Sequence, residues 1–290
     1  MIRTFLLLAT LAGASPIAAQ EAMPTDLAER LTQARAAEAT AQMMIDMQEA
    51  IGAAQMQYIG MTGGSAFGDG FRGAVAYPSQ DSSAWHVVLV TARGEGSQAD
   101  LKKLAEYEVA QGQIRTETLY DAGEAADLTG IALQMARAKY VAPRAVIAAP
   151  GVGYCLDGEP AAQGSPRSVS YIPLVLPPDE NGEIDAYVLN GPIAEGAVPL
   201  GKHYRVHFDE FGQVGDPEVV TDTCEVITWQ PDDQDLASSV YLTEFEEGAA
   251  PTVIHAFISA SLPMRLGVVT GDLIWPIAGG TIAAPVTAED

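Results

Sequence analysis

The sequence predicts an α+β fold, in which a long N-terminal helix and a small α/β layer precede a mainly antiparallel β-sandwich or partly open barrel. Three observations lead to this prediction. Apolar residues recur at helical spacing over residues 27–58, strand-like and helical runs mix up to residue 150, and helical spacing is scarce beyond it. We therefore expect four segments: 1–19 as a signal peptide, 20–62 as an amphipathic helix, 63–150 as a small α+β domain and 151–290 as a β-rich domain with one disulfide.

The first nineteen residues have the pattern of a secretory signal peptide. Arg3 gives a basic start, an apolar run extends from Phe5 to Ala12, and small residues lead to an expected cleavage site between Ala19 and Gln20. The apolar run is shorter than the roughly 20 residues that span a bilayer. The sequence therefore predicts a soluble periplasmic or secreted protein with no membrane insertion.

The chain is strongly acidic, with 38 Asp and Glu residues against 15 Lys and Arg residues and a formal net charge of −23. A surface this negative repels phosphate backbones and anionic headgroups. The composition therefore argues against nucleic acid and membrane surfaces as partners.

The predicted N-terminal helix carries one apolar stripe, and Thr25 or Asp26 can cap its start. The stripe comprises Leu27, Leu31, Ala34, Ala37, Ala41, Met44, Met47, Ile51, Ala54 and Tyr58. An unbroken helix of this extent would be about 50 Å long, which exceeds the size of a small domain. Either Gly52 marks a break, or the helix packs against a partner, such as another protein or a second copy of the chain.

Short strands and two hairpins are expected along the rest of the chain. Strands are predicted at 74–78, 85–93 and 112–120, a short helix at 99–108 and a longer helix at 124–140. The Asn181-Gly182 pair predicts a hairpin between 168–177 and 184–190, and Phe211-Gly212 a second hairpin after 201–208. Further strands are expected at 238–245, 252–260, 264–270 and 272–278.

The chain has two cysteines, Cys155 and Cys224. An even pair in an exported protein is most simply a disulfide. Neither residue belongs to a C-x-x-C motif or adjoins a histidine, so catalysis or metal binding by these thiols has no support from the sequence. We expect Cys155 and Cys224 to form a disulfide that stabilises the β-rich half.

Histidines provide the main candidates for a catalytic or metal site. Strand alternation places Tyr204, Val206 and Phe208 on one face of a strand and His203, Arg205 and His207 on the other. His203 and His207 lie roughly 13 Å apart along that strand, too far for one metal ion to bind both. A site would combine His203 with His255 and Asp209; the alternative is that His255 is a hydrogen-bonded core histidine.

Other motifs give little support for an enzyme. Gly94, Gly96 and Ala99 match a dinucleotide-binding pattern, but the following segment leaves little room for the crossover helix that such a site requires. Met44 and Met47 are typical of core packing, and a copper site is the alternative. The chain has no H-E-x-x-H, P-loop, S-x-x-K or G-x-S-x-G motif.

Three stretches within residues 200–282 resemble uncharacterised exported proteins of proteobacteria: LGKHYRVHFDEFGQV, DTCEV and PTVIHAFISASLPMRLGVVTGDLIWPIAGGTI. The resemblance implies export and a β-rich module, and it implies no activity. The leading hypothesis is an exported, soluble, non-catalytic protein that acts as an envelope interaction or binding module without a cofactor. The alternative is a metal-assisted hydrolase that uses His203, His255 and a divalent metal.

Overall fold

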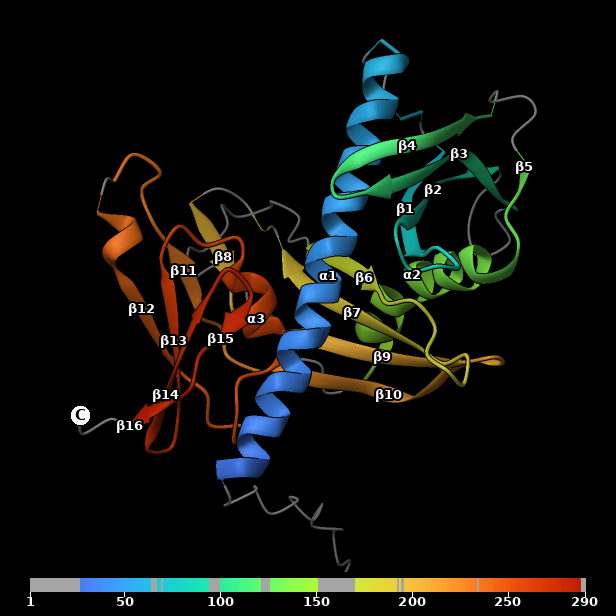
Figure 1. The fold of residues 1–290 in the computed structure, drawn as a ribbon. Helices are drawn as coiled ribbons and strands as arrows, with labels where there is room; N and C mark the ends of the chain where they lie inside the picture. Colours follow the sequence, from blue (N-terminus) through green and yellow to red (C-terminus); the bar gives the residue numbers. More distant parts are fainter. Residues whose placement is uncertain are drawn as a thin grey trace, which may run out of the picture.

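The computed structural model describes residues 27–63, 67–68, 70–93, 100–120, 126–150, 170–191, 193, 196–233 and 235–287. Over these residues the fold is α+β: a long N-terminal helix is followed by mostly antiparallel sheets that pack like a sandwich and do not close into a barrel (Figure 1). This confirms the predicted fold class. The predicted signal peptide, the pattern at 94–99 and Cys155 lie outside the described residues. No described helix is long and apolar enough to cross a membrane.

Helix α1 (Leu27–Met61) is unbroken at Gly52 and runs along the whole molecule (Figure 1). The predicted apolar stripe faces the core of the protein, as the almost complete burial of Ala34, Met44, Met47 and Ala54 shows. These side chains join one core cluster with residues of the chain's own sheets. Most of the stripe therefore packs within the chain itself, and a partner for α1 stays a prediction.

The first sheet has the strand order β1-β2-β3-β4, and β5 pairs with β3. The strands are β1 (Phe71–Pro78), β2 (Trp85–Arg93), β3 (Asp100–Ala110), β4 (Gln113–Leu119) and β5 (Ala126–Asp127). Successive side chains of a strand point to opposite faces of the sheet, and both faces of this sheet are buried. Ala74 and Val87 belong to the core cluster of α1, whereas Val75 and Val88 belong to a second cluster built on helix α2.

Helix α2 (Gly130–Ala148) lies between the first sheet and a second sheet of order β10-β9-β7-β6. These strands are β6 (Ser170–Val175), β7 (Ile184–Gly191), β9 (His203–Asp209) and β10 (Gly212–Thr221). Both predicted hairpins are present, β6–β7 and β9–β10. Tyr204, Val206 and Phe208 pack in the α2 cluster, which confirms their predicted core face.

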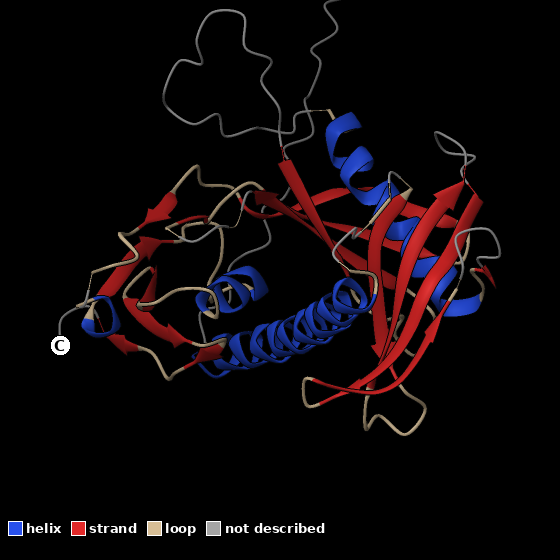
Figure 2. Ribbon diagram, turned by 90° about the horizontal axis from the view of Figure 1, so that it is seen from above, coloured by secondary structure: helices blue, strands red, loops and turns tan. Residues whose placement is uncertain are grey.

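The C-terminal part lies on the other side of α1 from these two sheets (Figure 2). It contains a two-stranded pair, β8 (Ala197–Pro199) with β11 (Val226–Thr228), and a sheet of order β12-β13-β14-β15, to which β16 adds by pairing with β14. The strands of that sheet are β12 (Val240–Glu244), β13 (Arg265–Thr270), β14 (Leu273–Ala278), β15 (Thr281–Ile282) and β16 (Val286–Thr287). Helix α3 (Val253–Ser259) contacts α1, β13 and β14.

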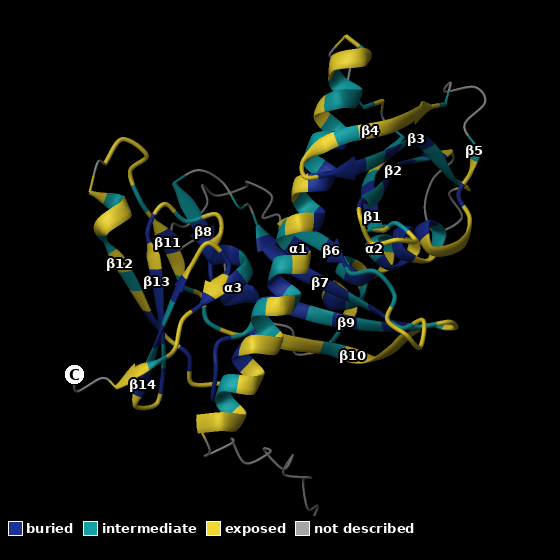
Figure 3. Ribbon diagram, in the orientation of Figure 1, coloured by how far each residue is buried: buried dark blue, intermediate teal, exposed yellow. Residues whose placement is uncertain are grey.

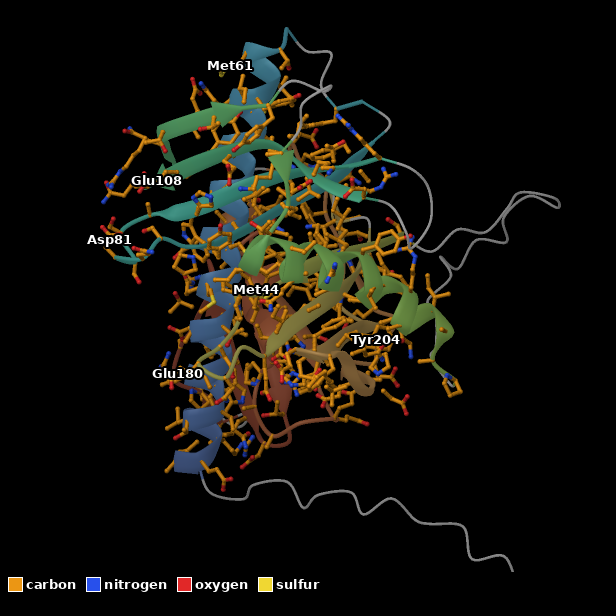
Figure 4. All side chains as sticks on the ribbon, turned by 90° about the vertical axis from the view of Figure 1, so that its right-hand side faces the viewer. Met44, Met61, Asp81, Glu108, Glu180 and Tyr204 are labelled. Carbon is orange, nitrogen blue, oxygen red and sulfur yellow. The ribbon has the colours of Figure 1, made fainter. Side chains whose placement is uncertain are left out.

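The exposed strands lie at the edges of the sheets. The edge strands β4 and β10 are largely exposed (Figure 3). The labelled carboxylates Asp81, Glu108 and Glu180 lie at the periphery (Figure 4), and none of the three is buried.

Two predicted elements are wrong. The helix expected at 99–108 is strand β3, because the segment pairs with β2 and β4 on its two edges and these contacts override its helix-forming Leu, Lys, Ala and Glu residues. The strand expected at 252–260 is helix α3. A short apolar run fits a buried helix as well as a buried strand, and Thr252 and His255 form a capping box that starts this helix.

Arg30 attaches the start of α1 to the C-terminal sheet. Its guanidinium donates hydrogen bonds to the carbonyl oxygens of Ala249 (2.7 Å) and Thr270 (2.8 Å) and to the Thr270 hydroxyl (2.7 Å). We expect Arg30→Met to lower the free energy of unfolding by about 2 kcal/mol, because buried carbonyls lose charged donors. Arg35→Met is the control, because Arg35 is more exposed and donates to one backbone carbonyl, that of Ile282, instead of two. Urea unfolding that gives equal effects for both variants would contradict this role.

Candidate functional site

His203 is completely buried at the start of β9. Its Nδ1 accepts a hydrogen bond from the backbone N–H of Asn190 (3.0 Å), so its Nε2 carries the proton and donates to the carbonyl oxygen of Pro199 (3.1 Å). Burial lowers the pKa of His203 to about 4, although the hydrogen bond to Pro199 opposes that shift. The imidazole is therefore neutral near pH 7, and both of its nitrogens are bonded to the backbone.

His255 is also buried, in the first turn of α3. Its Nδ1 accepts hydrogen bonds from the backbone N–H (3.1 Å) and the hydroxyl (3.0 Å) of Thr252, and its ring meets the Phe245 ring edge to face, with centroids 4.9 Å apart. Burial lowers the pKa of His255 to about 3, and charge repulsion from His203 adds to that effect. The two imidazoles are thus close enough to interact electrostatically.

Asp209 does not join the two histidines. It lies six positions beyond His203, roughly 20 Å along the same strand. Its Oδ1 accepts hydrogen bonds from the backbone N–H groups of Phe211 (2.8 Å) and Gly212 (3.0 Å), which holds the β9–β10 turn. Within the described residues, no group of three or more His, Cys, Asp or Glu side chains is arranged to hold a metal ion.

His207 has acidic partners. Its Nδ1 is 2.9 Å from Asp185 Oδ1 and its Nε2 is 3.5 Å from Glu183 Oε2. The hydrogen bond to Asp185 raises the pKa of His207. Arg205 lies on the same face and is also half-exposed, so the predicted polar face of β9 is open at these two residues and closed at His203.

Cys224 lies between β10 and β11. Its expected partner, Cys155, is outside the described residues, so their disulfide stays a prediction.

A cavity of about 1040 Å³ lies between α2, the start of β3 and the β9–β10 turn. The lining combines apolar side chains such as Leu133, Val141 and Phe208 with the basic side chains of Arg72 and Arg137 and the acidic side chains of Asp209 and Glu210. Lys102 also lines the cavity, but it is paired with Asp100 and Asp127. Volumes of this size accommodate small-molecule ligands, and apolar walls with a few charged groups are typical of such sites.

The sequence reasoning missed this cavity, although one signal pointed to it. Helix α2 carries three basic residues, Arg137, Lys139 and Arg144, and no acidic residue, in a chain with more than twice as many acidic as basic residues. A local reversal of charge on a single helix indicates a surface with a role other than solubility.

Comparisons with protein-family models, with curated proteins and with solved structures found no match for this chain.

Proposed function

We propose that this protein is an exported, non-catalytic binding module whose ligand occupies the cavity between α2 and the β9–β10 turn. The observation that carries the proposal is the cavity itself, with about 1040 Å³ of space and a lining of apolar side chains and charged groups of both signs. Export is supported by the signal-peptide pattern of residues 1–19.

The binding function is better supported than hydrolysis by the two buried histidines. A metal ligand or general base needs a free nitrogen lone pair. In His203 the one lone pair accepts the Asn190 N–H, and in His255 the Nδ1 atom accepts two bonds from Thr252. A hydrolase would have to break these bonds, and Asp209 would remain far from both rings. Metal analysis of the purified protein tests that alternative directly.

The ligand site is tested by filling it. We expect the neutral fluorophore N-phenylnaphthylamine to bind the wild-type protein saturably, because apolar side chains such as Leu133, Val141 and Phe208 line the cavity. Val141→Trp should weaken this binding about tenfold or more, because the indole occupies space at the rim of the cavity. Fluorescence titration measures the dissociation constant.

The matched control is Ile131→Trp. Ile131 is 41 % exposed and Val141 is 37 % exposed, both on α2, but Ile131 does not line the cavity. Absence of saturable binding to the wild type, or equal weakening by both variants, would reject this cavity as the ligand site.

A further inference from the structure

A second cavity, of about 600 Å³, adjoins the first in the gap between β1 and β6, with α2 as its floor. The two cavities have Arg72, Leu101 and Tyr140 in common, so one ligand can extend through both. Among the described residues, the charged side chains that line the smaller cavity are Arg72, Lys139 and Arg144, and none of them is a carboxylate. This inverts the balance of a chain with 38 acidic and 15 basic residues.

Lys139 is the most enclosed of these cations. Its Nζ donates a hydrogen bond to the carbonyl oxygen of Pro173, on the edge strand β6, at 3.2 Å. An ammonium has three donors, so a single carbonyl leaves two of them available. Burial lowers the pKa of Lys139 to about 8, and no described carboxylate offsets that effect. The desolvation of Lys139 is therefore offset by one carbonyl oxygen and by no described carboxylate.

The backbone of β1 is shaped around this lysine. The register with β2 shifts between Phe71 and Gly73, and Gly73 has a φ of +93°. A Cβ atom at position 73 would lie 3.0 Å from Cε of Lys139. Glycine is needed here for both reasons, the positive φ and the close approach. The bulge lets the strand pass over the lysine stem.

Arg144 is held in place as well. Its Cζ lies 3.5 Å from the centre of the Tyr140 ring, and its Nη1 donates to the Tyr140 carbonyl oxygen at 2.5 Å. Stacking and a hydrogen bond fix the guanidinium and leave its other N–H groups available for a ligand. A fixed cation loses less conformational entropy when an anion binds.

We propose that the smaller cavity binds the oxyanion head group of the ligand, a carboxylate or a phosphate, through Lys139 and Arg144, while the apolar body of the ligand lies in the larger cavity. This inference rests on the proposed binding function and assigns its ligand class: an amphipathic anion. An anionic ligand can bind this protein in spite of its net charge of −23. Ion pairs between the ligand and the two basic side chains act at short range, whereas salt screens the repulsion between the ligand and distant carboxylates.

The test compares three probes in competition with N-phenylnaphthylamine: decanoate, decanol and inorganic phosphate. We expect wild-type protein to prefer decanoate over the neutral alcohol of equal length about tenfold or more, as a charged hydrogen bond requires. If the head group can be a phosphate, calorimetry should detect binding of inorganic phosphate. If phosphate does not bind and decanoate does, the head group is a carboxylate.

Lys139→Met should remove most of the preference for decanoate over decanol and leave decanol binding within about twofold, because methionine keeps the apolar volume. Lys202→Met is the control, since Lys202 pairs with Asp222 and lines neither cavity. Arg144→Met, at an exposed position, should also reduce the preference for decanoate over decanol, but by less. It replaces Lys139→Met in the test if that variant fails to fold.

The outcomes separate the two proposals. If neither the fluorophore nor decanol binds to the wild-type protein, the proposed binding function is overturned. Binding of both without preference for decanoate, or a preference that survives in Lys139→Met and Arg144→Met, would overturn the anion site alone.

Discussion

Replacing Gly201 by alanine should lower the free energy of unfolding by about 3 kcal/mol or more, the upper range for forcing an atom into a filled site. Gly201 connects β8 to β9, and a Cβ there would lie 1.6 Å from the carbonyl oxygen of Thr223 and 2.4 Å from its carbonyl carbon. Hydrogen bonds on both sides prevent the chain from moving away: Leu200 N–H donates to Glu225 (2.9 Å) and Lys202 N–H to Thr221 (2.8 Å).

Gly52→Ala is the matched control, because the chemical change is identical and the expected sign is opposite. Gly52 lies inside α1, and a Cβ there meets no atom within 4 Å. Alanine should stabilise the helix by about 0.5–1 kcal/mol, through its better helix propensity and a less flexible unfolded chain. Urea unfolding of both variants measures the difference, and a Gly201→Ala protein of wild-type stability would contradict the packing described for the β8–β9 connection.

Features with a local cause were predictable from the sequence. The apolar stripe of α1 repeats at helical spacing, and the Asn181-Gly182 turn specifies the β6–β7 hairpin through its backbone preference alone. Strand β3 was predicted wrongly because distant contacts decide it, and helix α3 because a short apolar run fits a buried helix as well as a buried strand. The segment Asp100–Ala110 has helix-forming residues and becomes a strand because it is paired on both edges. The continuity of α1 through Gly52 also depends on packing against several sheets.

The candidate site was less accessible to sequence reasoning. Alternation along β9 placed His203 on the polar face, but it could not show that Pro199 of β8 lies against the ring or that the ring is completely buried. The cavities are formed where α2 meets residues more than twenty positions away, such as Phe208 and Pro173. Contacts between residues so far apart in the chain cannot be predicted from a single sequence. The charge reversal on α2 is the part of the site that the sequence did contain.

Acidification from pH 7 to pH 5 should destabilise the protein by about 4 kcal/mol through His203 and His255, roughly equal shares coming from each residue. Both have a pKa of about 6.5 when unfolded and well below 5 when folded, about 4 and about 3. Over this range the unfolded chain therefore binds more protons, and stability falls as the pH falls from 6.5 towards 4. His207 acts in the opposite direction, because Asp185 raises its pKa, but it is half-exposed and its effect is small. The stabilisation from Asp127 and Asp179, whose pKa values are lowered, is lost mainly as the pH falls through their unfolded value of 3.8, which lies below this range.

Glutamine variants isolate this effect, because glutamine does not titrate and can replace the hydrogen bonds of both rings. His255→Gln keeps the capping box with Thr252, in which glutamine is a standard third residue. In His203→Gln the side-chain amide can accept from Asn190 and donate to Pro199. Urea unfolding at the two pH values should show about half of the difference in each single variant and almost none in the double variant. His86→Gln, at a half-exposed histidine paired with Glu106, should keep the full difference. A double variant as acid-sensitive as the wild type would show that other groups, and not the two buried imidazoles, bind protons when the protein unfolds.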